Sequence, residues 1–178
     1  MRREWERDFV DYVSARALAL RRTAYLLSGD WHAAEDLTQA TLTKLYLAWR
    51  KIDRAGSVDA YARRTLVRTF LDSRRRLWSR ERPHADVPEQ PAPTDLADDR
   101  IVLWHALDRL PANQRAVIVL RYWEDLSVAE TAVALNMSEG TVKSSASRGL
   151  AALREGLQGS RTAGAGDRDV RDQLEVLR

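Results

Sequence analysis

The sequence predicts an all-α fold, with two small helical domains joined by a flexible linker. Apolar residues recur at intervals of three and four along most of the chain, which is the period of one helix face. The short alternating runs that strands require do not occur. Four of the five prolines lie between residues 83 and 98, where they forbid a long helix. We therefore expect domains at 1–82 and 99–158, a linker at 83–98 and a tail at 159–178.

Three helices are expected in the first domain. The apolar face of the first consists of Phe9, Val13, Ala17, Leu20, Ala24 and Leu27. Residues 28–30, Ser-Gly-Asp, end this helix and cap the next, which runs from about residue 33 through residue 49. A Gly-Ser pair at 56 and 57 precedes the third helix, which begins near Val58. The residues that this third helix carries inward are Ala62, Leu66 and Phe70.

The second domain is expected to begin near Asp99 with a helix that ends before Pro111. A further helix then runs through Leu120, and two more follow, joined by a tight turn. The tail at 159–178 begins with small and polar residues that cannot bury enough apolar surface, so we expect it to be disordered.

Charge is spread unevenly along the chain. Residues 1–82 hold 18 Lys and Arg against 11 Asp and Glu, whereas residues 83–98 hold four acids and no base. The C-terminal part, residues 99–178, holds 11 of each. A basic front half favours contact with a polyanion there.

Composition also excludes several kinds of site. The chain has no cysteine, which removes disulfides, thiolate zinc sites and cysteine nucleophiles. We expect no cofactor and no metal. Neither a signal peptide nor a run of about 18 apolar residues is present, so a cytoplasmic protein without membrane insertion is expected.

Residues 127–150 carry the pattern of a helix-turn-helix. Ser127 and Glu130 have the spacing of a capping box, Asn136 suits a left-handed turn, and Ser138 caps the second helix. That helix presents short hydroxyl-bearing and basic residues on the face opposite its apolar stripe, and such a face fits a major groove. The candidate contacts are Gly140, Thr141, Lys143, Ser144, Ser147 and Arg148. From periodicity alone, an ordinary helical hairpin with a solvated face stays equally open.

A second candidate nucleic-acid surface is the basic face of the third helix. Its arginines are Arg63, Arg64, Arg68, Arg74, Arg75 and Arg76. Guanidinium groups at this density repel one another unless phosphates neutralise them. Tyr61 and Trp78 could stack on unpaired bases, whereas Phe70 lies on the apolar stripe. A merely solvated basic face is the plainer alternative.

These segments, taken in order, resemble the extracytoplasmic-function (ECF) sigma factors of the sigma-70 family, in particular their sigma-E-like members. The matching stretches are AEDLTQATLTKLYLAWRKI at 34–52, DAYARRTLVRTFLDSRRR at 59–76 and ALDRLPANQRAVIVLRYWEDLSVAETAVALNMSEGTVKSSASR at 106–148. The resemblance covers roughly residues 9–156. It implies a region 2 bundle at 1–82 and a region 4 helix-turn-helix at 99–158.

The resemblance also implies roles for the candidate residues. Asp36, Leu37 and Gln39 would dock on core RNA polymerase, the arginine-rich helix would grip the minus-10 promoter element as it melts, and the helix from Glu139 would read the minus-35 element. The acidic linker would enter the RNA channel of the polymerase. Partners would be core polymerase, promoter DNA and an anti-sigma protein. Ser145 stands where relatives often have Arg, which would remove a DNA contact.

Two other functions are open to a chain with these motifs. A helix-turn-helix regulator that acts without polymerase docking explains residues 127–150 but leaves the first domain and the linker unexplained. A nucleic-acid-processing enzyme lacks support, because the sequence has no Gly-rich phosphate loop and no cluster of metal ligands or catalytic residues. We therefore expect a DNA-binding transcription initiation factor that is not an enzyme.

Overall fold

The computed structural model describes residues 2–52, 57–78 and 97–159 of the chain. Its elements are α1 (Arg2–Ser28), α2 (Trp31–Ala48), α3 (Val58–Trp78), α4 (Ala97–Asp108), α5 (Ala112–Ile118), the π-helical turn η1 (Val119–Trp123), α6 (Val128–Leu135) and α7 (Glu139–Gly159). No strand occurs within these described ranges, and the predicted all-α class is confirmed. The predicted linker and tail lie outside the described residues, apart from residues 97 and 98, which begin α4, and Gly159, which ends α7.

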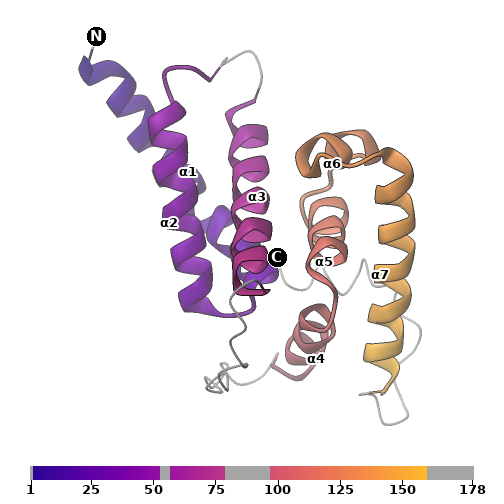
Figure 1. Cartoon of the computed structure of the whole chain (residues 1–178). Helices are drawn as coiled ribbons and strands as arrows, with labels where there is room; N and C mark the ends of the chain where they lie inside the picture. The colour runs from indigo at the N-terminus through magenta and orange to yellow at the C-terminus, as the bar shows by residue number, and fades with distance from the viewer. Residues whose placement is uncertain (1, 53–56, 79–96, 160–178) are drawn as a thin grey trace.

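The first three helices form the N-terminal bundle, in which α1 and α2 pack side by side and α3 packs against both (Figure 1). Gly29, with φ of 95°, makes the turn between α1 and α2 in a conformation that favours glycine. The Asp30 carboxylate then accepts a hydrogen bond of 2.8 Å from the Ala33 amide. This cap starts α2 at Trp31, two residues before the predicted start.

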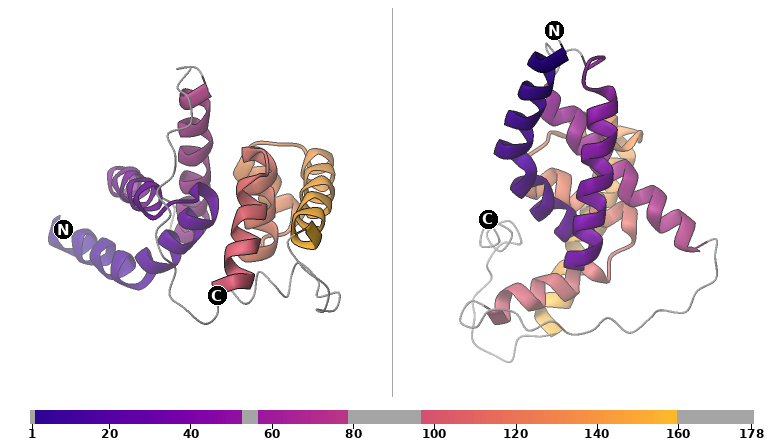
Figure 2. Two further views of the ribbon diagram at one scale, coloured as in Figure 1. Left: turned by 90° about the horizontal axis from the view of Figure 1, so that it is seen from below. Right: turned by 90° about the vertical axis from the view of Figure 1, so that its left-hand side faces the viewer.

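Helices α4 to α7, with η1, form the C-terminal bundle, in which α5 lies against α7 (Figure 2). Pro111 occupies the N-cap of α5, where its missing amide donor costs nothing. The sequence predicted one regular helix through Leu120, but the backbone changes to a π-helical turn from Val119 to Trp123. Asp125, with φ of 53°, follows it and redirects the chain toward α6.

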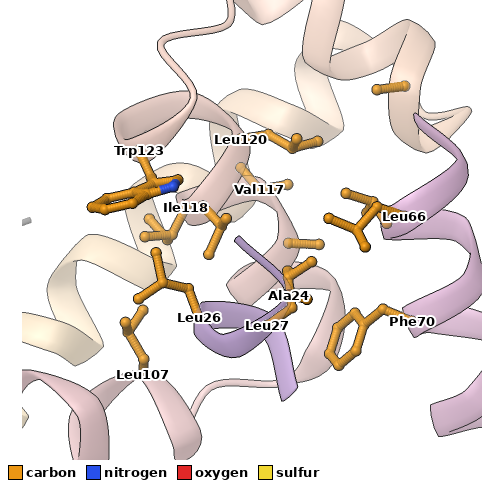
Figure 3. Packing of buried hydrophobic residues seen from close by; sticks show 14 of the residues in the cluster. Ala24, Leu26, Leu27, Leu66, Phe70, Leu107, Val117, Ile118, Leu120 and Trp123 are labelled. Atoms are coloured by element: carbon orange, nitrogen blue, oxygen red, sulfur yellow. The ribbon is translucent and has the colours of Figure 1, made fainter. Parts of the chain in front are cut away.

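The two bundles are in direct contact, a feature that the sequence did not predict. Apolar side chains of α1, α3, α4, α5 and η1 belong to one hydrophobic core (Figure 3). Residues from the N-terminal bundle in this core include Ala24, Leu27, Leu66 and Phe70, and those from the C-terminal bundle include Leu107, Val117, Ile118 and Leu120. Burying such side chains is favourable at about 25 cal/mol per Å² of apolar surface, which explains why the bundles adhere.

Candidate nucleic-acid interface

The helix-turn-helix geometry of residues 127–150 follows from its capping residues. The Ser127 hydroxyl accepts from the Glu130 amide at 3.1 Å, and the Glu130 carboxylate accepts from the Ser127 amide at 2.7 Å. Asn136 ends α6 in the left-handed conformation, with φ of 55° and ψ of 49°. Ser138 then caps α7 by accepting from the Thr141 amide at 3.1 Å. Each local expectation for this motif is met in the structure.

The exposed face of α7 contains all six predicted contacts. Gly140, Thr141, Lys143, Ser144, Ser147 and Arg148 are exposed, whereas Val142 and Leu153 on the opposite side are fully buried. The Arg148 Nε–H donates to the Ser144 carbonyl at 3.3 Å, so its guanidinium lies along the helix surface. A helix with small residues at its N-terminal end can approach base edges and phosphates closely.

The structure corrects the expectation that Ser145 stands at a DNA-contacting position. It is only 5% exposed and lies on the buried side of α7, between the helix and the rest of the C-terminal bundle. The expected loss of a DNA contact through the absence of Arg at this position therefore does not follow, because this position does not face outward. Gly149 on the same side is equally constrained, since a Cβ there would lie 2.9 Å from Cγ1 of Ile118 in α5.

The basic face of α3 divides into two groups. Arg64, Arg75 and Arg76 are exposed, whereas Arg63, Arg68 and Arg74 are half-buried. Tyr61 is exposed near the start of the helix, and Phe70 lies in the core, as its place on the apolar stripe predicted. The side chain of Trp78 lies outside the described residues.

Two of the half-buried arginines face acids from the C-terminal bundle. The Arg63 Nε lies 2.7 Å from Oε2 of Glu124, which follows η1. The Arg74 Nη2 lies 4.0 Å from Oδ1 of Asp108, at the end of α4. The sequence predicted the arginines but not their partners.

The three candidates for docking to polymerase differ in how exposed their side chains are. Asp36 and Gln39 are exposed on α2, and the Gln39 amide donates to the Glu35 carboxylate at 3.1 Å. Leu37 is 7% exposed and belongs to the core of the N-terminal bundle. Because the Leu37 side chain packs inward, it supports the helix rather than forming part of an outer docking surface.

Arg115 is a buried charged residue whose contacts the sequence did not predict. It is 1% exposed, and its Nη1 donates to the Leu27 carbonyl of α1 at 2.9 Å. Its Nη2 donates to the Asp108 carboxylate at 2.9 Å. Burial lowers the pKa of Arg115, and the Asp108 charge acts in the opposite direction. One feature of the sequence indicated the contact between the bundles. The run at 116–120 is uninterrupted in apolar residues, so a helix there buries every face and needs neighbours outside its own bundle.

The two sets of candidate DNA-contacting residues lie on separate helices, α3 and α7. Figure 1 shows α5 and α6 lying between α3 and α7, and α3 packs against α6.

In the described ranges, no group of His, Cys, Asp and Glu side chains is placed to hold a metal ion. None of the helices there combines the length and hydropathy that crossing a bilayer requires.

Comparison with known families and proteins was made for the whole chain. Residues 13–80 match the model for sigma-70 region 2, and residues 100–153 match the model for sigma-70 region 4. An RNA polymerase sigma-E factor of Streptomyces coelicolor is 42% identical over 152 residues, which cover 84% of this chain and 86% of that protein. The ECF RNA polymerase sigma factor SigL of Mycobacterium tuberculosis is 36% identical over 152 residues, covering 80% and 84%.

Solved structures give the same likeness. The sigma factor RpoE of Bartonella quintana, solved with the anti-sigma factor NepR, superposes with a TM-score of 0.67 at 30% identity, covering 86% of this chain and 99% of that chain. CnrH, solved with the cytosolic domain of CnrY, has a TM-score of 0.63 at 20% identity over 88% of this chain and 91% of that chain, a likeness of fold alone.

Proposed function

The chain belongs to the sigma-70 family of RNA polymerase sigma factors, in its ECF branch, and from this premise we propose how its two bundles direct core polymerase to promoters and initiate transcription. The observation that carries the proposal is the six-residue face of α7. All six residues are exposed, and the helix that presents them is fixed by a capping box, a left-handed turn and a second cap. This geometry suits reading of the minus-35 element in the major groove.

The N-terminal bundle would engage the minus-10 element. Arginines on α3 would neutralise phosphates, and Tyr61, exposed on the same helix, offers a ring on which an unpaired base can stack. Selective binding of unpaired bases lowers the free energy of the melted state, so opening needs no bond to be made or broken by this chain. Its role is therefore non-covalent, and we propose that it is not an enzyme.

Docking to core polymerase would use the exposed part of α2, where Asp36 and Gln39 lie. The proline-rich segment at 83–98 would join the bundles within the polymerase. We propose that the protein acts in the cytoplasm and has an anti-sigma protein as a further partner, because the related RpoE was solved with the anti-sigma factor NepR.

Run-off transcription with purified core polymerase tests this function. The full chain is expected to give defined transcripts from a subset of a promoter library, whereas core polymerase alone gives none. Co-purification with core polymerase separates this function from that of a regulator that binds DNA on its own. Absence of both transcripts and association would refute the proposal.

A further inference from the structure

The basic face of α3 has two sides, which differ in what lies opposite them. Two of its arginines, Arg63 and Arg74, face carboxylates of the C-terminal bundle. A second side lies about 100° further around the helix, and its residues follow one another at steps of four and seven. These residues form the outer arginine stripe, which consists of Arg64, Arg68 and Arg75. A DNA strand bound to this stripe would run along the outside of α3.

A lysine of the neighbouring helix lies beside this stripe. Lys44 is exposed on α2, which packs along α3 (Figure 1). Its Nζ donates to the hydroxyl oxygen of Thr69 in α3 at 2.9 Å. Because Thr69 directly follows Arg68 along α3, the ammonium group of Lys44 lies next to the outer arginine stripe. The positive charge of this surface therefore continues from α3 onto α2.

The hydroxyl group of Thr69 fixes the position of this ammonium group. Its O–H donates to the Thr65 carbonyl, one turn earlier in α3, at 2.7 Å. The oxygen of Thr69 is therefore left as an acceptor, and it points this acceptor at Lys44. A protonated lysine has three N–H donors, and Thr69 takes one of them. Two donors remain for the oxygens of a phosphate.

The charge of Lys44 is not neutralised by an acid. In residues 2–52, 57–78 and 97–159, no carboxylate forms an ion pair with it, whereas Arg63 and Arg74 both face one. A lysine that only joined two helices would gain little here, because an exposed hydrogen bond to a hydroxyl group replaces one to water. A cation held in place and left without an acid is suited to an anionic partner.

We propose that Lys44 is a further contact for the phosphates of the melted minus-10 strand, held in place by Thr69, so that this strand crosses from α3 onto α2. The inference rests on the proposed function and extends its minus-10 site to a second helix. Phosphates bind the outer arginine stripe, and the strand then passes Thr69 to reach the ammonium group. Because duplex DNA is stiff over this distance, such a path favours the unpaired strand.

Salt-dependent binding of the full chain to a short single-stranded DNA of fixed sequence tests the contact. Lys44→Gln removes the charge but keeps a long polar side chain. The slope of log affinity against log salt should fall by about 0.7, the value for one phosphate contact on a single strand. The variant should therefore lose about fivefold in affinity between 1 M and 0.1 M salt, relative to the parent. Lys44→Arg keeps the charge and should keep the slope. An unchanged slope in Lys44→Gln would overturn the proposal.

Two further variants separate a DNA contact from a structural role. Arg7→Gln removes an exposed cation from the second turn of α1 and should leave the slope unchanged. Equal losses of slope in Arg7→Gln and Lys44→Gln would show a general effect of net charge and overturn the proposal. Thr69→Val keeps every charge but removes the acceptor of the Lys44 hydrogen bond. Its affinity should fall about twofold at an unchanged slope, because a freer lysine must be ordered on binding. Unchanged affinity would overturn the role of Thr69.

A cross-linker at position 44 tests proximity without relying on charge. The chain has no cysteine, so Lys44→Cys provides a single thiol for a photoreactive benzophenone label. Irradiation should attach the single-stranded DNA at this position and far less at Arg7→Cys labelled in the same way. Equal yields would overturn the path over α2. Neither measurement needs polymerase, so a chain that contacts the strand through Lys44 but yields no run-off transcript would refute the proposed function alone. Normal transcripts with an unchanged slope in Lys44→Gln would refute this inference alone.

Discussion

The two proposed DNA-contacting surfaces differ in how accessible they are. On α7, all six candidate residues are exposed, and the face carries little beyond hydroxyls and two basic side chains. On α3, the arginine face is denser in charge, but Arg63 and Arg74 already face carboxylates of the other bundle. The proposed surface with the higher density of positive charge is thus partly engaged by carboxylates of the same chain, whereas the proposed recognition face on α7 is fully exposed.

This difference bears on what each proposed surface would contribute to binding. The α7 face offers few contacts, so its binding to DNA alone would be weak. The α3 face would add a larger electrostatic contribution, because it carries more positive charge.

The largest effect is expected on the α3 side. Replacing Arg74, Arg75 and Arg76 together by Ala should weaken binding to a melted minus-10 element on the order of a hundredfold and reduce its salt slope by about 2, because three charges proposed to contact phosphates are lost. Permanganate footprinting should show less open complex at unchanged minus-35 occupancy. Normal melting would show that these three arginines do not contact the minus-10 element.

The next largest effect is expected for Arg115, which lies buried between the two bundles. Arg115→Met fills the same space but leaves the Leu27 carbonyl without its partner, so the free energy of unfolding should fall by about 2 kcal/mol. Urea denaturation measures it. Arg109→Met, an exposed position after α4, is the control and should change stability little. Equal stability of both variants would show that the Leu27 hydrogen bond contributes nothing.

A smaller effect is expected on α7. Arg148→Ala should cost about 1.4 kcal/mol of discrimination between cognate and altered minus-35 elements, which is about tenfold in relative affinity. Competition binding with the two sequences measures it. Arg154→Ala, an exposed arginine further along the same helix, should reduce affinity for both sequences without changing their ratio. Unchanged selectivity of the Arg148 variant would show that the residue is not read against bases.

The smallest effect is local. Ser127→Ala removes the cap of α6 and should lower stability by about 1 kcal/mol at neutral pH. Hydrogen bonds from the Ser127 side chain and then from its amide lower the pKa of Glu130 below its ordinary 4.5. Their contribution is thus present above that pH and is lost as the pH falls through the lowered value. Thermal unfolding at neutral and acidic pH should show the difference between the two proteins narrowing in acid.

Local features of the sequence were the easiest to predict. The capping box, the left-handed Asn136 and the alternation of exposed and buried positions on α7 follow from short-range geometry, and the structure reproduces them. Leu37 and Ser145 were harder, because the resemblance assigned them to surfaces without considering which way each side chain points. Their burial follows from the register of α2 and α7 against their neighbours.

Contacts between distant segments could not be obtained from local patterns. The Thr23–Glu124 and Arg63–Glu124 pairs join residues far apart in sequence, and nothing in helical periodicity links them. The contact between the two bundles could not be predicted for the same reason. Only the fully apolar run before Arg121 hinted that α5 is enclosed from more than one side.

The π-helical turn at Val119–Trp123 has a consequence for how the length of this chain can vary. Such a turn accommodates one residue more than an α-helix of the same span. A chain that lacked this extra residue would form a regular α-helix here, and the residues on either side of the turn would keep their faces. The hydrogen bond from the Trp123 indole to Thr23 could then persist in both forms. A one-residue difference in length between related chains can thus be absorbed at this point without moving α6 and α7.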